Sequence, residues 1–272
     1  MSFSLVAPEQ FTARQQQYLE KFRQSIDLVS SQAGAIVGAK DVDSRHLIAT
    51  DSYARIVGLS KGGDVTGRFD REMPCEGTAQ FADCYVREDR DLLSHRDPGR
   101  MTSVINIHEY SDGLKGLVFN KFALKHRPTK SILGTIYSAY EFDISRFLAM
   151  LPNYTFEFGA GCSIARADDA PIEIETQLTE FEYEIAFLLT MRWSLGQIRD
   201  FLSEYRRGTE AGVIASVRTI GDKLGGGLRG ASALRDRLVE LGVHRKMPKA
   251  LFDHVTAAEP LRAGSSLRED LP

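Results

Sequence analysis

The stretch MTSVINIHEYSDGLKGLVFNKFALK, residues 101–125, indicates a β-hairpin. Two runs rich in β-branched and other apolar residues flank the turn sequence SDG at 111–113. A third run of the same kind, SILGTIYSAYEFD at 131–143, follows after a short break. Since consecutive strands joined by short connections pair in opposite directions, these three runs predict an antiparallel sheet.

The segments upstream of the hairpin predict more strands and the helices that cover the sheet. AGAIVGAKD (33–41) and SRHLIATD (44–51) are short apolar runs bounded by turn residues, which is typical of strands. DSYARIVGL (51–59) and residues 77–96 have helical spacing. We therefore expect an α+β domain over 34–145, with helices packed on one face of an antiparallel sheet, after an N-terminal helical extension at 1–33.

Downstream of the sheet the pattern becomes helical. We expect a linker with one helix at 146–176, an all-α module of four helices at 177–255, and a flexible tail at 256–272. The first helix of the module begins with a capping box, because Thr179 is followed three residues later by Glu182. Four short helices with compact connections are compatible with a helix-turn-helix.

The third helix of this module is the candidate DNA reader. It carries Val213, Val217, Ile220 and Leu224 on one apolar stripe, which leaves small and polar residues on the other side. Basic residues near its start favour phosphate. The residues predicted to contact DNA are Arg206, Arg207, Thr209, Ala215, Ser216, Arg218, Thr219 and Lys223. A plain four-helix cap on the sheet domain, with these arginines in solvent, stays open as an alternative.

Charge is distributed unevenly along the chain, whose formal net charge is −3. Residues 191–250 hold 12 Lys and Arg against 6 Asp and Glu, whereas residues 1–175 hold 20 against 24. A basic segment on an otherwise acidic chain favours contact with a polyanion such as duplex DNA. A solvated helical face rich in arginine would give the same counts.

Composition and motifs argue against other classes. No run of apolar residues is long enough for a membrane span, and the N-terminus lacks the pattern of a secretory signal. Three cysteines without CxxC spacing favour a cytoplasmic location over a disulfide scaffold or a zinc site. The six histidines have no metal-ligand spacing, and no catalytic motif is present, so we expect neither a metal nor an enzyme.

The module resembles a known DNA-binding family. LTEFEYEIAFLL (178–189), SLGQI (194–198) and VIASVRTIGDKL (213–224) resemble the LuxR-type helix-turn-helix. Phe181, Gly212 and Ser216 depart from its pattern, and the connection before the third helix is about four residues longer. Because LuxR-type modules commonly pair through the fourth helix, the resemblance implies a homodimer with contacts at Leu234, Leu238 and Leu241, or alternatively through the linker helix.

The sheet domain has the element order of a PAS domain, a family that usually binds a small molecule between sheet and helices. With the module, GAKDVDSRHLIATDSYARIVGL (38–59), INIHEYSDG (105–113) and VFNKF (118–122) resemble the VqmA-like quorum-sensing receptors, cytoplasmic regulators that sense a hydroxypyrazine autoinducer. The resemblance covers about 34–252. It implies a pocket formed by Tyr53, Tyr85, Phe119 and Lys121. Phe119 and Lys121, two apart on a strand, face the same side.

Each of these pocket residues also has a simpler interpretation. Lys121 could face solvent with Phe119 packed at a sheet edge, and the two tyrosines could be ordinary core residues. We expect a cytoplasmic, ligand-responsive transcriptional regulator with no cofactor, whose PAS domain binds a small heteroaromatic signal and whose helical module binds duplex DNA as a dimer. The alternatives are a PAS scaffold with a protein-binding helical tail, and a haem or flavin redox or light sensor.

Overall fold

The computed structural model describes residues 3–151, 153–154, 164–167, 177–205, 210–225 and 230–257 of the 272-residue chain. Three of the predicted DNA contacts, Arg206, Arg207 and Thr209, lie outside the described residues, as does most of the predicted linker and tail. None of the helices in the described ranges is both long and apolar enough to cross a membrane.

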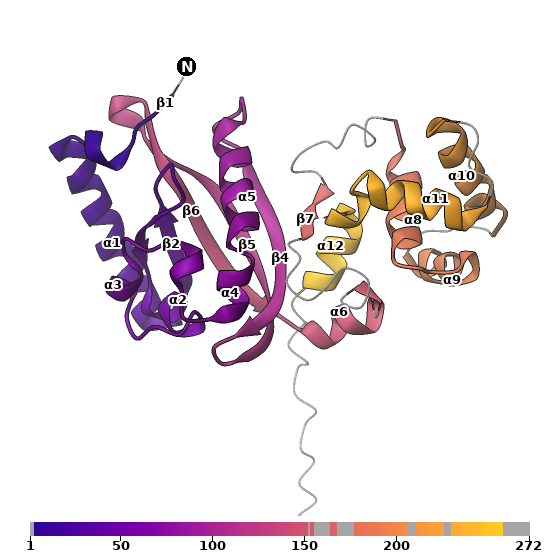
Figure 1. The fold of residues 1–272 in the computed structure, drawn as a ribbon, viewed down its shortest axis with the longest axis horizontal. Coiled ribbons are helices and arrows are strands. Elements are labelled where there is room, and N and C mark those ends of the chain that lie inside the picture. The colour runs from indigo at the N-terminus through magenta and orange to yellow at the C-terminus, as the bar shows by residue number, and fades with distance from the viewer. Residues whose placement is uncertain are drawn as a thin grey trace, which may run out of the picture.

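An antiparallel sheet forms the frame of the N-terminal domain (Figure 1). Its strands lie in the order β3-β2-β6-β5-β4, so the sequence-distant strands β2 and β6 are neighbours. Their bounds are β2 (Ile36–Lys40), β3 (His46–Ala49), β4 (Met101–Tyr110), β5 (Gly113–His126) and β6 (Ser131–Phe142). A short strand, β1 (Ser4–Leu5), pairs in parallel with the start of β6. The predicted hairpin and the α+β fold class are confirmed.

Different helices pack against the two faces of this sheet. One face packs against four helices, α2 (Asp51–Ile56), α3 (Gly62–Val65), α4 (Glu76–Gln80) and α5 (Ala82–Ser94). The helix expected over 77–96 is thus two helices, α4 and α5, that meet at Phe81. The other face packs at its β2–β6 side against α1 (Ala13–Ala33), through apolar residues such as Tyr18 and Phe22.

Local sequence signals explain where α1 begins and ends. Thr12 and Gln15 form a capping box in which each side chain accepts a hydrogen bond from the other residue's backbone N–H. The helix ends at Gly34, whose backbone has a φ of 64°, a conformation that suits glycine because it lacks a Cβ. Single turns of 3-10 helix lie at Pro8–Gln10, Asp70–Glu72, Arg127–Thr129 and Val243–Arg245.

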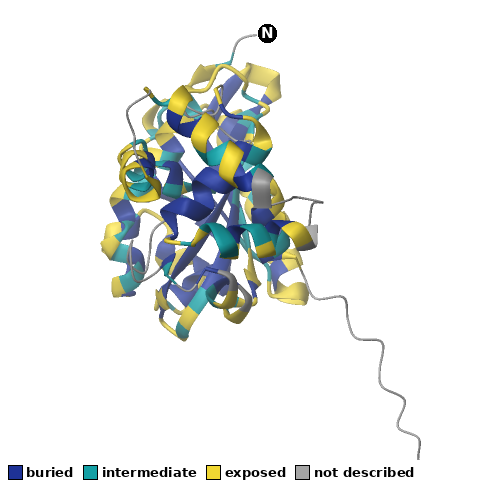
Figure 2. Ribbon diagram, turned by 90° about the vertical axis from the view of Figure 1, so that its right-hand side faces the viewer, coloured by how far each residue is buried: buried dark blue, intermediate teal, exposed yellow. Residues whose placement is uncertain are grey.

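The C-terminal module contains the four helices expected, namely α8 (Glu180–Thr190), α9 (Leu195–Tyr205), α10 (Glu210–Lys223) and α11 (Ala231–Glu240). The capping box of α8 is present, since Glu182 N–H donates to Thr179 Oγ1 at 3.2 Å and Thr179 N–H donates to Glu182 Oε2 at 2.7 Å. Residues on every side of α8 are buried, which makes it the central helix of the module (Figure 2). The structure adds a strand and a further helix, β8 (Lys246–Met247) and α12 (Lys249–Thr256).

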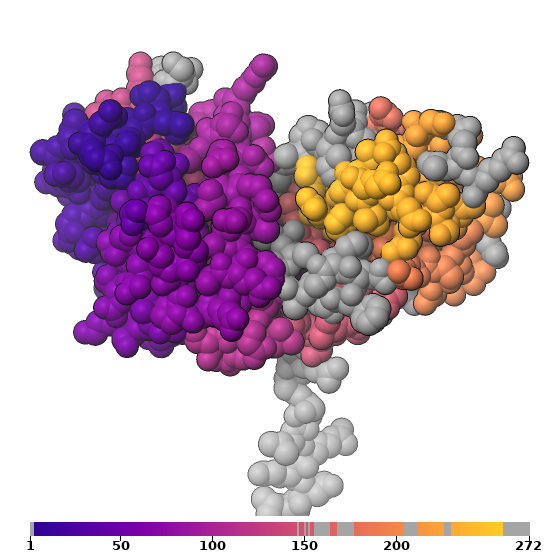
Figure 3. Space-filling view, viewed as in Figure 1, coloured from indigo at the N-terminus to yellow at the C-terminus, as the bar shows by residue number. Residues whose placement is uncertain are grey.

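A short strand joins the two parts of the chain. β7 (Ile164–Arg166), which lies within the predicted linker, pairs antiparallel with β4 and parallel with β8. The sheet therefore continues from the N-terminal domain into the helical module, which stands beside it as a second lobe (Figure 3). Ile105, Val118 and Phe142 on the outer face of the sheet share one apolar cluster with α6 (Ile144–Met150) and with the module.

Candidate ligand cavity and DNA-binding surface

An internal cavity lies between the sheet and the helices α2, α4 and α5. Its volume is about 20 Å³, enough for one water molecule. All four side chains predicted to bind a ligand line it, together with eight that the sequence did not indicate. The lining residues are Lys40, Tyr53, Val57, Asp70, Thr78, Tyr85, Asn106, His108, Tyr110, Phe119, Lys121 and Tyr137.

The predicted geometry of Phe119 and Lys121 on β5 is confirmed. Both side chains face the cavity, and they are only 8% and 4% exposed, so Lys121 does not reach solvent. The registers of β5 against β4 and β6 place Phe119 between Val104 and Ala139 in the middle of the sheet, so it is not an edge residue. Tyr53 and Tyr85 approach the same cavity from α2 and α5, and both are buried.

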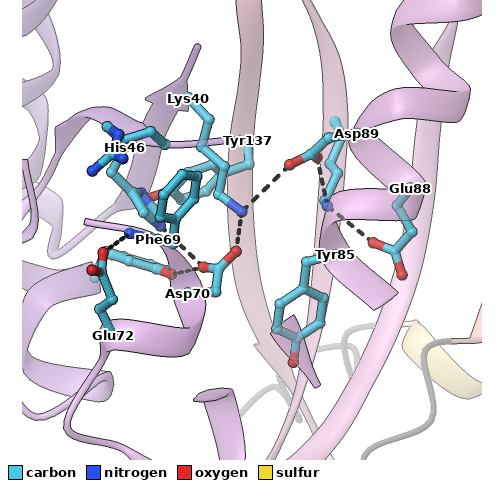
Figure 4. Close-up of polar contacts among 12 residues, drawn as sticks. Lys40, His46, Phe69, Asp70, Glu72, Tyr85, Glu88, Asp89 and Tyr137 are labelled. Atoms are coloured by element: carbon cyan, nitrogen blue, oxygen red, sulfur yellow. Dashed lines mark hydrogen bonds and ion pairs between the residues drawn. The ribbon is translucent and has the colours of Figure 1, made fainter. Parts of the chain in front are cut away.

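Lys40, Asp70 and Lys121, which line this cavity, belong to a chain of buried charges (Figure 4). The Lys40 ammonium contacts the carboxylate of Asp70 and lies 3.5 Å from Asp89 Oδ2. The Lys121 ammonium lies 2.9 Å from both Asp89 Oδ1 and Glu88 Oε2. Asp89 therefore joins the two lysines, which come from the distant strands β2 and β5. Each buried ammonium has a carboxylate partner, the condition under which charges are tolerated away from water.

The ionisation of these groups is set by burial and by their partners. Burial alone would raise the pKa of Asp70, but the Lys40 charge and the hydrogen bond from His46 outweigh it and hold that pKa well below its usual range. Burial would likewise raise the pKa of Asp89, and the charges of Lys121 and Lys40 lower it. Burial opposes the charge on Lys121, but Asp89 and Glu88 raise its pKa above the usual value. Asp70, Asp89 and Lys121 therefore stay ionised near neutral pH.

His46 and Tyr53 also form hydrogen bonds with Asp70, and Tyr137 forms one with His46. His46 Nε2 lies 3.0 Å from Asp70 Oδ1, and the Tyr53 hydroxyl donates to the same oxygen at 3.2 Å. A carboxylate only accepts, so His46 donates from Nε2 and its Nδ1 accepts from the Tyr137 hydroxyl at 3.2 Å. Burial lowers the pKa of His46, which keeps the ring neutral. Gly38 leaves room for this arrangement, because a Cβ there would lie 2.2 Å from the Tyr137 hydroxyl oxygen.

Three further aromatic side chains that line the cavity, Tyr85, His108 and Tyr110, contact one another. The Tyr85 hydroxyl lies 3.2 Å from His108 Nε2, and the His108 ring lies over the Tyr110 ring with centroids 3.8 Å apart. Burial lowers the pKa of His108 and raises the pKa of Tyr85 and of Tyr110. The cavity is thus lined by flat rings for stacking and by two ammonium groups, which lie 5.9 and 5.8 Å from the centre of the Tyr85 ring, a combination suited to a small heteroaromatic molecule.

Residues that the sequence analysis missed carry most of the polar chemistry. Asp89 could have been found, since it lies on the buried stripe of α5 with Tyr85 and Leu92, where an acidic residue needs a cationic partner. Lys40 and Asp70 gave no comparable signal. Their contact depends on the placement of β2 beside the turn before α4. Among the described residues, no cluster of three or more His, Cys, Asp or Glu could hold a metal ion.

The candidate reading helix α10 has the predicted orientation within the module. Val213 and Ile220 are buried, and Val217 and Leu224 pack at the margin of the core. Ala215, Arg218 and Thr219 are exposed, and Ser216 is half-buried. The Thr219 hydroxyl donates to the Ala215 carbonyl at 3.0 Å. Arg218 is an exposed cation on this face. These positions are compatible with a DNA contact, which stays a prediction.

Lys223, the other cation predicted to contact DNA, has a partner inside the module. Its ammonium lies 2.7 Å from Glu182 Oε2, the same oxygen that caps the start of α8. Burial would raise the pKa of Glu182, and the hydrogen bonds from Lys223 and from Thr179 lower it. This ion pair joins the end of α10 to the start of α8.

The expected dimer contacts need a correction. Leu234 and Leu238 on α11 are 2% and 0% exposed and belong to the module's own core, beside Ile185 and Leu188. Leu241 is half-buried in the same cluster. Leu234 and Leu238 pack α11 against α8, so these two side chains offer no free surface to a second copy.

Fold and site together give an α+β domain with the element order of a PAS domain and an internal cavity, joined to a helical module. No protein-family model and no curated protein sequence matches the chain. The chain is similar over most of its length to solved structures of VqmA, the receptor type that the sequence resemblance indicated. A Vibrio cholerae VqmA dimer is 25% identical, with 84% of this chain and 91% of that chain covered and a TM-score of 0.43.

Two further VqmA structures are similar to the chain. A phage VqmA–DPO complex is 24% identical, with 86% of this chain and 95% of that chain covered and a TM-score of 0.40. A Vibrio cholerae VqmA–ligand–DNA complex is 22% identical, with 90% and 93% covered and a TM-score of 0.39.

Proposed function

We propose that this protein is a ligand-responsive transcriptional regulator. Its PAS domain binds a small heteroaromatic signal in the internal cavity, and its helical module binds duplex DNA, as a dimer. The observation that carries the proposal is the single cavity that collects Tyr53, Tyr85, Phe119 and Lys121 from three separate elements. VqmA, to which the chain is similar, has been solved with a ligand and with DNA, which agrees with this assignment.

Ligand binding in this cavity would combine stacking with a charge-assisted hydrogen bond. Phe119 supplies a ring face in the middle of the sheet, and Lys121 supplies an ammonium whose charge is fixed by Asp89 and Glu88. The cavity of about 20 Å³ is smaller than a heteroaromatic ring, so side chains must move apart to admit one. Ligand binding would therefore change the packing between the sheet and the helices α2, α4 and α5.

Titration with a defined probe tests the sensor half of the proposal. Pyrazin-2-ol is added to the full chain while its heat of binding and its unfolding temperature are measured. We expect saturable binding and a rise in the unfolding temperature. Phe119→Ala and Lys121→Met should each weaken binding at least tenfold, since each removes one of the two kinds of contact. Tyr140→Phe, at an exposed position of β6, is the control and should bind like the wild type.

A salt series tests the DNA half. Binding to random duplex DNA should weaken steeply with salt, because contacts to phosphate release counterions. Arg218→Ala removes one exposed cation of α10, so the slope of log K against log salt should become shallower by about 0.9. Arg237→Ala removes an exposed cation of α11 and serves as the matched control. Absence of measurable DNA binding at low salt would exclude a DNA-binding regulator.

A further inference from the structure

Two hydroxyl groups at one wall of the cavity have no hydrogen-bond partner among the described residues. They are Thr78 Oγ1 on α4 and the Tyr110 hydroxyl on β4. Both residues line the cavity, and they are 2% and 4% exposed. Burying a hydroxyl without a partner costs about 1–3 kcal/mol, which is why most buried polar groups in proteins are paired. Asp70, which lines the same cavity, is by contrast fully paired, since it accepts hydrogen bonds from Lys40, His46 and Tyr53.

Close packing holds these two hydroxyls on the same wall. Gly77, next to Thr78, lies so near β4 that a Cβ there would be 2.2 Å from the Glu109 carbonyl oxygen. The Cys75 thiol donates to the same carbonyl at 3.3 Å. Helix α4 therefore packs closely against β4 beside Tyr110, and both Thr78 and Tyr110 are buried there.

Their position differs from that of the Lys121 ammonium. Lys121 pairs in register with Thr102, whereas Tyr110 lies eight residues further along β4. The two groups therefore approach the cavity from different places along the sheet. Glu88 and Asp89 contact the Lys121 ammonium, whereas the ring stacked on Tyr110 is the neutral His108. The wall with Thr78 and Tyr110 offers neutral hydroxyl donors in place of an ammonium.

We propose that Thr78 and Tyr110 form a second polar subsite, which donates hydrogen bonds to an acceptor atom of the bound heteroaromatic ring. This inference rests on the proposed sensing function and adds to it a requirement on the ligand. The ligand carries one polar group for Lys121 and a separate acceptor, a ring nitrogen or an exocyclic oxygen, for the two hydroxyls. A ring without that acceptor leaves both hydroxyls unpaired and binds more weakly.

Matched probes test this requirement. Pyrazin-2-ol and pyridin-2-ol differ by one ring nitrogen that is replaced by CH. We expect the wild type to bind pyrazin-2-ol about fivefold more tightly, the effect of one neutral hydrogen bond. Thr78→Val and Tyr110→Phe remove one hydroxyl each at nearly constant shape, and each should reduce this preference. Lys121→Met should weaken both probes to a similar extent and leave their ratio unchanged.

The ligand-free protein gives an independent measurement. Because each hydroxyl is unpaired, Thr78→Val and Tyr110→Phe should keep or raise the unfolding temperature without probe. A lower unfolding temperature together with an unchanged probe preference would overturn the inference, since the hydroxyls would then serve the fold, for example through a bound water molecule. Wild-type binding of the probes with an unchanged preference in both variants would also overturn it, and would leave the proposed sensing function intact. Failure of the wild type to bind either probe at millimolar concentration would overturn both proposals.

Discussion

At the scale of single residues, Asp89 joins the two lysines that line the cavity. Its carboxylate contacts the Lys121 ammonium at 2.9 Å and the Lys40 ammonium at 3.5 Å, and it is 1% exposed. A buried ion pair adds little net stability over apolar packing, but removing one partner leaves an uncompensated charge. Asp89 therefore fixes the position of both lysines. Its contribution to stability can be measured by replacing it.

Replacement of Asp89 by Asn tests this role. We expect Asp89→Asn to lower the free energy of unfolding by about 3 kcal/mol, because two buried ammonium groups lose a carboxylate. Urea denaturation of the full chain measures the change. Asp91→Asn, on the exposed side of the same helix, is the control and should change the free energy by less than about 0.5 kcal/mol. Equal effects of the two variants would contradict the role assigned to Asp89.

Because buried His46 is neutral, the free energy of unfolding should depend on pH. Burial lowers the pKa of His46 in the folded state, so below about pH 6.5 the unfolded chain binds a proton that the folded chain does not. Stability should fall as the pH decreases from about 7 to 5, and fall again below about pH 4 as Asp70 and Asp89 are protonated on unfolding.

Urea denaturation at pH 7 and pH 5 measures the first step. His46→Gln lacks the titrating ring, so its stability should change less between these two pH values than that of the wild type. His95→Gln, at an exposed position, is the control and should behave like the wild type. A pH dependence that is identical in all three proteins would argue against His46 as its source.

The residue scale also shows what the sequence could predict about the site. The four residues taken from the resemblance all line the cavity, and the strand period alone placed Phe119 and Lys121 on one face. The sequence could not show that Lys121 is paired, because Asp89 lies 32 residues away on another element. An unpaired hydroxyl such as that of Tyr110 is harder still to predict, because it is unpaired only where no neighbouring residue supplies a hydrogen-bond partner.

At the scale of helices and strands, capping signals predicted the structure well. The box predicted at Thr179 marks the start of α8, because the Thr179 side chain accepts a backbone N–H that the helix leaves unpaired. Ser194 caps the start of α9 in the same way. The short strands β7 and β8 were not predicted, since three and two residues are too few for an alternating pattern. Leu234 and Leu238 show a related limit, because the resemblance that implied dimer contacts there does not show how α11 packs on α8.

The ion pair between Lys223 and Glu182 indicates that Lys223 has a structural role in α10. We expect Lys223 to position the reading helix on α8 and to contribute little to phosphate contact. Lys223→Met should lower the free energy of unfolding by about 1 kcal/mol or less, as the pair is partly exposed. It should leave the salt dependence of DNA binding unchanged, in contrast to Arg218→Ala. A shallower salt slope in Lys223→Met would instead identify Lys223 as a phosphate contact.

At the scale of the whole molecule, β7 connects the cavity to the helical module. Strand β4 carries Asn106, His108 and Tyr110 on its cavity face, and its Val104 and Ile105 pair with β7. β7 pairs in turn with β8, which follows α11 and precedes α12. A change in β4 on ligand binding can thus reach the module through backbone pairing as well as through the apolar cluster around Phe147 and Ile164.

Proline substitution in β7 tests this connection. Ala165 pairs with Val104 of β4 on one side and with Lys246 of β8 on the other. Ala165→Pro removes the backbone N–H and disfavours a central strand, whereas Ala165→Ser keeps it and serves as the control. We expect the proline variant to bind pyrazin-2-ol and DNA separately, but to lose most of the change in DNA affinity that the probe causes in the wild type. DNA titrations with and without the probe measure that change. If the proline variant retains it in full, the coupling runs through the apolar cluster and β7 only tethers the two lobes.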